Sequence, residues 1–329
     1  MPKISVIIPV YNVEKYIEKC VHSLMQQSME EDIEFIFIND NTPDKSIILL
    51  NQVLLNYPKR QHQVFIIHNP TNLGIAKTRQ IGVEQSKGEY IGWCDSDDWV
   101  DSDMYETMYK ATNHGNTDIV VCNCMEEVSQ RYVTTFVLAH TPHEVLANSW
   151  KDKHMPYGLV FHLFKRELFS KSLNEPVPTC QGEDTYLMRY LYFYAKSIRF
   201  VPQPFYHYNR MNLGSITHNP QLTFNQWEAH QKNINKIEKL FYGSPNGYEI
   251  FHTAINYLKY TRKQQYKNVF PSFYDYYKTY SECYKDINQL FQTPIRVQLK
   301  TYLVYNIYPV FWFFFHKEWM DSKLLCTQK

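Results

Sequence analysis

Short apolar runs alternate with amphipathic stretches over the first 120 residues or so. The apolar runs predict five strands, at Ile4–Pro9, Glu34–Asn39, Val64–His68, Tyr90–Cys94 and Asp118–Cys122. The stretches between them have apolar residues at helical spacing and predict helices over Val13–Gln27, Asp44–Leu55, Ile75–Gln85 and Asp103–His114. This alternation predicts the α/β class, with a mostly parallel sheet that carries helices on both faces.

Polar residues follow directly after each of the first four predicted strands. They are Tyr11 and Asn12, Asp40 and Asn41, Asn69 and Asn72, and Asp95 to Asp98. In open parallel sheets, ligands bind beyond the carboxyl ends of the strands. We therefore expect all four groups to project into one crevice.

The fourth group, Asp95-Ser96-Asp97-Asp98, places three carboxylates within four positions at the end of a buried strand. Carboxylates this close repel one another unless a positive charge lies among them. Hard oxygen ligands suit Mg²⁺ or Mn²⁺, which completes its coordination shell with water and substrate phosphates. The alternative is a solvated acidic turn that caps a helix starting near Asp101.

Composition narrows the class of protein. The formal net charge is +1, so no global field favours a nucleic-acid partner. Seven cysteines without a CxxC pair or zinc-type spacing indicate reduced thiols in a cytosolic protein. The chain enters directly with a strand and contains no run of 18 apolar residues, so we expect neither a signal peptide nor an ordinary transmembrane span.

Four segments carry a resemblance to a known family. They are Pro9-Val10-Tyr11-Asn12, Asn39-Asp40-Asn41-Thr42-Pro43-Asp44, the run from Asn72 to Gly82 that continues to Tyr90, and the Asp-X-Asp motif Asp95-Ser96-Asp97. In this order and spacing they resemble the inverting family 2 glycosyltransferases, which have the GT-A fold. Asn41 stands where that family usually has glycine, and because Asn tolerates left-handed backbone we expect the turn to survive. Thr78 and Gln80 replace the commoner Ala and Asn, which leaves the role of Arg79 intact.

The resemblance implies a nucleotide-sugar donor bound along these loops. Asp40 would accept a hydrogen bond from the imide N–H of uracil and Tyr11 would lie against the base; a helix-capping Asp and an interfacial Tyr are the ordinary alternatives. Arg79 would hold Asp40 or the diphosphate, because its fork suits either partner. The remaining donor-binding residues implied by the resemblance are Pro9, Val10, Ser96 and Arg210.

The resemblance also implies a metal cofactor, Mn²⁺ or Mg²⁺. Asp97 would ligate the metal directly, and Asp95 would contact the ribose or the metal with its bound water. The cation would neutralise the charge that builds on the departing nucleoside diphosphate.

Beyond Cys124 the resemblance continues on the acceptor side, through Pro156–Arg166 and Cys180–Leu187. Inverting transfer needs one base that takes the proton from the attacking acceptor hydroxyl. The resemblance places this base at Asp184, supported by Glu183. Acidic charge at a helix N-terminus is the alternative interpretation of this pair.

The family's closing segment is similar to Val201–Arg210 and the loop that follows it to Thr217. Arg210 would fold over the diphosphate once the donor is bound. His207 is a candidate third metal ligand, although a histidine between two tyrosines is more often simply packed.

These segments predict a GT-A catalytic domain over residues 1–217, in which 1–124 bind the nucleotide sugar and 125–217 carry the acceptor site and base. Residues 218–329 are predicted to be an α-helical region, with helices over Gln221–Phe241, Tyr248–Lys267 and Ser272–Phe291. Within it, the aromatic segment 302–315 has basic flanks, which suit the surface of a membrane. Docking of this segment on the catalytic domain, or on the partner in a homodimer, is the alternative.

We therefore predict a cytoplasmic, metal-dependent inverting glycosyltransferase, peripheral at the membrane if segment 302–315 binds there. It would move a sugar from a nucleotide diphosphate donor, expected to be a UDP-sugar, to a hydroxyl of a growing or lipid-linked glycan in capsule, exopolysaccharide or lipopolysaccharide assembly. A nucleotidyltransferase is one alternative, but a Gly-rich phosphate loop would then be expected near the N-terminus, where this chain has Val10-Tyr11-Asn12-Val13. A catalytically silent binding or scaffold protein is the other, and the intact carboxylates disfavour it.

Overall fold

The computed structural model describes residues 1–127, 131–133, 141–148, 158–171 and 183–212, together with residues 233, 236–237 and 239–243. The chain divides into two compact units, Met1–Pro220 and Gln221–Lys329. Of the predicted helix Gln221–Phe241, the residues that are described are helical. The other two predicted helices and the aromatic segment 302–315 lie outside the described residues, so they stay predictions, as does the functional division of the chain into domains.

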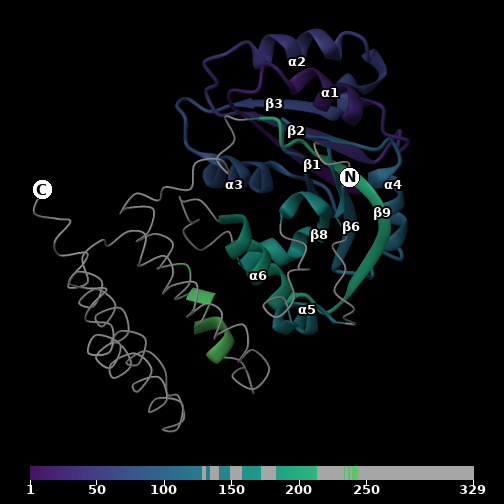
Figure 1. Cartoon of the computed structure of the whole chain (residues 1–329), viewed down its shortest axis with the longest axis vertical. Coiled ribbons are helices and arrows are strands. Elements are labelled where there is room, and N and C mark those ends of the chain that lie inside the picture. Colours follow the sequence, from purple (N-terminus) through teal and green to yellow (C-terminus); the bar gives the residue numbers. More distant parts are fainter. Residues whose placement is uncertain are drawn as a thin grey trace, which may run out of the picture. The chain divides into compact units, whose positions relative to one another are not determined.

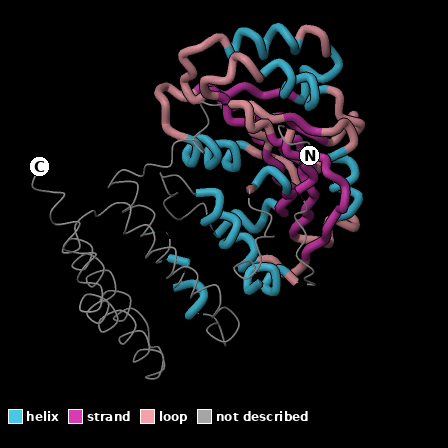
Figure 2. The backbone as a smooth tube through the Cα atoms, in the orientation of Figure 1, coloured by secondary structure: helices cyan, strands magenta, loops and turns pink. Residues whose placement is uncertain are grey.

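The first unit is built on one mixed sheet (Figure 1, Figure 2). The strands are ordered β3-β2-β1-β4-β8-β6-β9-β5, and β7 pairs with β6 beside this path. Their bounds are β1 Ile4–Val10, β2 Ile33–Asn39, β3 Val64–His68, β4 Tyr90–Trp93, β5 Trp99–Val100, β6 Ile119–Glu126, β7 Arg131–Val133, β8 His162–Lys165 and β9 Ile198–Tyr208. Strands β3, β2, β1 and β4 run parallel to one another, which confirms the predicted arrangement of the first four strands.

Helices α1 (Ile17–Met25), α2 (Ser46–Leu54), α3 (Ile75–Gln85) and α4 (Met104–Ala111) follow the first strands. Figure 1 shows α1 and α2 on one side of strands β1 to β3 and α3 on the other, so the predicted cover of both faces is confirmed for this part of the sheet. Helix α1 begins at Ile17, later than predicted, and the preceding Val13 and Glu14 amides donate to Ser46 Oγ and Asp44 Oδ2. Strand β1 is buried along its whole length, as expected for a parallel strand covered on both faces.

The other half of the sheet is antiparallel in part. Strand β8 lies antiparallel between β4 and β6, so the predicted strand Asp118–Cys122 continues the sheet only through β8. Strand β9 pairs in parallel with β6 and antiparallel with the short β5, and this register sets Tyr206 opposite Val100. The end of β9 is thereby brought next to the loop between β4 and β5.

The remaining α-helices belong to this second half of the sheet. Helix α5 (Pro142–Asn148) packs against α6 (Glu183–Tyr194). Short 3₁₀ helices are η1 Pro58–Gln63, η2 Leu159–Phe161 and η3 Arg166–Lys171. Within the described part of the chain, no helix combines the length and the apolar character needed to cross a bilayer.

Candidate active site

The loops after β1, β2 and β3 are joined to one another at one edge of the sheet. The Asn12 amide donates to Thr42 Oγ1 over 2.8 Å, and Asn69 Nδ2 donates to Asp40 Oδ1 over 2.8 Å. Asn41 adopts left-handed backbone, with φ 55°, so the expectation that asparagine replaces the usual glycine in this turn is confirmed. The polar residues that follow these strands therefore form one connected rim.

Asp40 is buried beneath this rim, with 4% of its surface exposed. Besides the bond from Asn69, its carboxylate accepts hydrogen bonds from the Leu73 amide over 2.8 Å and the Gly74 amide over 2.9 Å. Gly74 has φ 81°, a conformation that suits glycine, and α3 begins directly after it. Asp40 thus fixes the entry to α3, and its predicted contact with a base stays a prediction.

Arg79 of α3 is the central cation of the site. Its guanidinium donates to Asp95 Oδ1 over 2.8 Å and to Glu183 Oε1 over 2.5 Å, and its side chain is 10% exposed. Burial lowers the pKa of Arg79, but Asp95 and Glu183 raise it above its ordinary value overall, so the group stays charged. Of the two partners predicted for Arg79, Asp40 is therefore wrong: the guanidinium joins the end of β4 to the start of α6.

The three aspartates of the Asp95–Asp98 loop have different surroundings. Asp95 is one-third exposed and pairs with Arg79. Asp97 is partly exposed, and its Oδ2 accepts a hydrogen bond from Asn212 Nδ2 over 2.8 Å. Asp98 is 1% exposed and accepts from Tyr206 and from the Asn209 amide. Asp95 and Asp97 are thus the carboxylates that a ligand can reach.

The charges in this loop are unbalanced, and this tests whether a metal ion fits. Burial, and then the neighbouring Asp95, raise the pKa of Asp97 above its ordinary value. Among the described residues, Arg79 is the one cation paired with this loop. No cluster of three or more His, Cys, Asp or Glu ligands is present in the described part. Mg²⁺ is usually held by one or two carboxylates together with substrate phosphates, so Asp95 and Asp97 fit such a cation.

Glu183 and Asp184 open helix α6, as predicted. Glu183 is 7% exposed and bound by Arg79; burial raises its pKa, although Arg79 acts to lower it. Asp184 is partly exposed and lies near enough to Arg79 to raise the pKa of that guanidinium. The predicted base and its supporting carboxylate therefore lie beside the cation that holds Asp95.

Two residues of the closing segment have partners of their own. Both ring nitrogens of His207 are engaged, Nδ1 with Glu127 at 2.6 Å and Nε2 with Asp101 at 2.9 Å. These two bonds favour the packed alternative for His207, and its candidacy as a metal ligand stays untested. Arg210 pairs with Glu126 at 2.5 Å with its side chain 55% exposed, so a role over the diphosphate would require it to leave Glu126.

The remaining predicted donor contacts differ in exposure. Pro9 and Val10 are buried within β1, and Ser96 is 4% exposed. Tyr11 is 47% exposed at the end of β1, which leaves its ring open to a ligand. The donor-binding roles of all four residues stay predictions.

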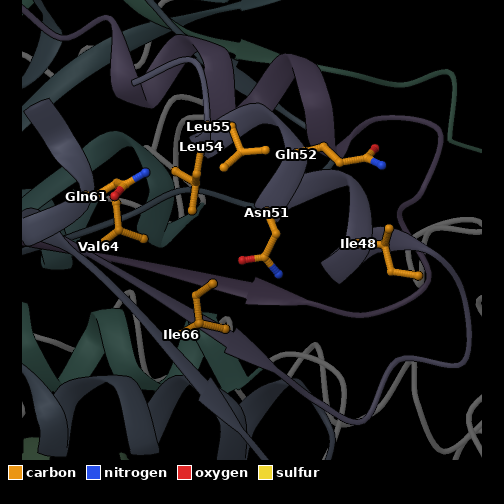
Figure 3. A pocket seen from close by; sticks show the side chains of 8 residues that line it. All are labelled: Ile48, Asn51, Gln52, Leu54, Leu55, Gln61, Val64 and Ile66. Carbon is orange, nitrogen blue, oxygen red and sulfur yellow. The ribbon is translucent and has the colours of Figure 1, made fainter. Parts of the chain in front are cut away.

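A groove elsewhere on the molecule contains none of these residues. It has a volume of 600 Å³ and lies between α2, η1 and β3 (Figure 3). Its lining is mainly apolar and carries no charged side chain; the residues are Ile48, Asn51, Gln52, Leu54, Leu55, Gln61, Val64 and Ile66. The candidate active site is therefore the edge at the end of β4, where the carboxylates lie.

Sequence reasoning missed three residues that hold the Asp95–Asp98 loop. They are Tyr206, Asn209 and Asn212 of the closing segment, in which roles were predicted from the sequence only for His207 and Arg210. These three polar residues recur at every third position across the end of the strand, and this spacing was the available signal. Their hydrogen-bond partners lie more than 100 residues earlier in the chain, and only the pairing of β9 with β5 brings the two segments together.

Comparison with known proteins gives a family match. A family model described as Glycosyl transferase family 2 matches residues 5–173. The uncharacterized glycosyltransferase EpsJ of Bacillus subtilis is 34% identical over 180 residues, which cover 52% of this chain and 50% of EpsJ. The poly(ribitol-phosphate) beta-glucosyltransferase of Bacillus spizizenii is 31% identical over 215 residues, 63% of this chain and 32% of that protein. The chain thus spans half or less of the length of these two relatives.

Solved structures share the architecture. S. aureus TarS 1-349 in complex with UDP has a TM-score of 0.61 at 18% identity, covering 76% of this chain and 69% of TarS 1-349. The mannosyltransferase PcManGT from Pyrobaculum calidifontis, in complex with GDP-Man and Mn2+, has a TM-score of 0.51 at 13% identity, covering 98% and 84%. At these identities the likeness shows the fold alone, and it confirms the expected GT-A type of α/β fold.

Proposed function

The chain belongs to glycosyltransferase family 2, whose model matches just over half of it, and from this premise we propose that it is a metal-dependent inverting glycosyltransferase. The observation that carries the proposal is the arrangement at the end of β4. Two reachable carboxylates, Asp95 and Asp97, lie there with one cation, Arg79, which also binds the carboxylate next to the proposed base. One edge of the sheet thus supports both a donor site and an acceptor site.

On the donor side, Asp95 and Asp97 would hold Mn²⁺ or Mg²⁺, and the bound cation supplies charge neutralisation for the leaving nucleoside diphosphate. Tyr11 offers its exposed ring to the base, and Arg210 would release Glu126 to contact the diphosphate. We propose a UDP-sugar as donor. The UDP in the TarS structure supports this choice, and the GDP-Man of PcManGT provides the competing base.

On the acceptor side, Asp184 would take the proton of the attacking hydroxyl as the sugar is transferred with inversion. Glu183 would orient the first turn of α6 through its bond to Arg79. We propose a growing or lipid-linked surface glycan as acceptor; the relative named as a poly(ribitol-phosphate) beta-glucosyltransferase supports a polymeric acceptor that carries hydroxyl groups. Cytoplasmic location, contact of segment 302–315 with the membrane, and homodimer formation belong to the same proposal.

A donor panel tests the proposal. The full chain is heated with UDP-, GDP- and dTDP-sugars, each with and without Mn²⁺, because a donor that binds the folded state raises the melting temperature by mass action. We expect a UDP-sugar to give the largest shift, only with metal, and UDP to be released on turnover with acceptor. Release of pyrophosphate would support a nucleotidyltransferase instead, and no shift with any donor would support a binding or scaffold protein.

A further inference from the structure

Tyr206 of β9 reaches the Asp95–Asp98 loop with a single hydroxyl group. This hydroxyl donates to Asp98 Oδ2 over 2.6 Å and accepts from the Asp95 amide over 3.1 Å. The tyrosine is fully buried, so no water competes for either bond. One group of β9 therefore fixes the first and last residues of the loop.

Asn209 adds a second pair of bonds to the same loop. Its amide donates to Asp98 Oδ1 over 2.7 Å, and its Nδ2 donates to the Asp97 carbonyl over 3.0 Å. Both oxygens of Asp98 are thus bonded by this chain, and only 1% of the residue is exposed. Asp98 is consequently the residue through which Tyr206 and Asn209 hold the loop, and the oxygens of Asp98 are not available to a ligand.

These hydrogen bonds stabilise the loop against the mutual repulsion of its carboxylates. A cation held by one or two carboxylates requires their oxygens to stay at fixed positions, and supporting hydrogen bonds provide that constraint. We propose that Tyr206 is a positioning residue for metal binding, which acts through Asp98 and the Asp95 backbone to hold Asp95 and Asp97 in place. The inference rests on the proposed function.

The test is Tyr206→Phe in the full chain, with Mn²⁺ affinity measured by titration calorimetry in the absence and in the presence of UDP. We expect the dissociation constant to rise about tenfold, the low end of the effect of losing a supporting contact at a metal site. Tyr192→Phe is the matched control, since Tyr192 is equally buried and its hydroxyl bonds His162 Nε2 at 2.8 Å. It should lower the melting temperature by a similar amount and leave Mn²⁺ affinity unchanged. Equal loss of affinity in both variants would reduce Tyr206 to a general structural role and overturn the inference.

Hydrogen exchange provides a readout that needs no metal. In Tyr206→Phe the Asp95 amide loses its acceptor, so we expect the peptide that spans Asp95 to Asp98 to exchange on the order of tenfold faster, with Tyr192→Phe as the unchanged control. Unaltered exchange together with unaltered Mn²⁺ affinity would sink the inference alone. Absence of Mn²⁺ binding by the unchanged chain, both alone and with UDP present, would instead overturn the proposed function and the inference that rests on it.

A double change identifies the partner through which Tyr206 acts. Asp98→Asn alone is expected to weaken Mn²⁺ binding about as much as Tyr206→Phe, and the two together are expected to cost little more than either one, because both break the same contact. Fully additive losses would show that Asp98 acts independently, as a ligand would, and would contradict the assigned route.

Discussion

The loops that follow β2 and β4 lie at the same edge of the sheet, but they are held in different ways. The carboxylate of Asp40, after β2, takes all of its hydrogen bonds from the neighbouring loop, within 34 residues of the chain. The loop after β4 is held from the end of β9 and the residues that follow it, 108 to 115 positions away. It also keeps two carboxylates that the described part of the chain satisfies only in part.

This contrast separates framework from function. A buried carboxylate with three donors is a stable structural element, because each donor offsets the cost of removing the charge from water. Several carboxylates with one cation between them repel one another unless a bound cation offsets their charge. We infer that the first loop shapes the site and that the second does the binding.

The largest expected effect concerns the base. Asp184→Asn should lower the rate of transfer by about 10²–10⁴-fold, the usual contribution of general base catalysis, and leave donor binding nearly intact. Single-turnover assays and donor titration measure the two effects separately. Asp103→Asn, at the start of α4, is the matched control for acidic charge at a helix N-terminus. Unchanged turnover in Asp184→Asn would remove it as the base.

The next effect concerns the link between the two halves of the site. Arg79→Met leaves Glu183 buried without its cation, so we expect a loss of about 3–5 kcal/mol in the free energy of unfolding, measured by urea denaturation. Adding Glu183→Gln should restore part of that loss, because the stranded charge is gone. Arg210→Met breaks an ion pair whose arginine is 55% exposed and should cost less than about 1 kcal/mol. Similar losses for the two arginines would contradict the central place given to Arg79.

A third pair of changes tests the contrast between the two loops directly. Asp97→Ala should weaken Mn²⁺-dependent donor binding by roughly a hundredfold, the upper end of effects seen for supporting residues, and leave stability unchanged or higher. Asp40→Ala should act in the opposite sense and cost about 1–3 kcal/mol of stability, because it strands buried amide donors. Calorimetric titration and denaturation of both variants give the answer. Metal and donor binding that survive in Asp97→Ala would count against the ligand assignment.

The features that could be predicted from the sequence are those set by residues close together in the chain. The strands β1 to β4, helix α3 and the left-handed turn at Asn41 each depend on neighbouring residues, and each was found. The insertion of β8 between β4 and β6 was missed, because a four-residue strand carries little periodicity and its place in the sheet depends on remote pairing. The Glu183 partner of Arg79 lies 104 residues away, and only the folded chain brings the two together.

The smallest effect concerns the half of the sheet that carries β8. Burial lowers the pKa of His162 to about 3, and its ring is bonded to the Gly158 carbonyl and the Tyr192 hydroxyl. Below the ordinary pKa of 6.5, His162 binds a proton in the unfolded chain but stays neutral in the folded chain. Stability is therefore lost as pH falls from about 6.5 towards 3. The slope contributed by this one group approaches about 1.4 kcal/mol per pH unit. Urea denaturation between pH 7 and 5 should show this slope in the unchanged chain and in His68→Gln, on the exposed edge strand β3, and a shallower one in His162→Gln. An equal slope in all three would mean that His162 takes up its proton in the folded state, and that this half of the sheet is more open to water than its burial indicates.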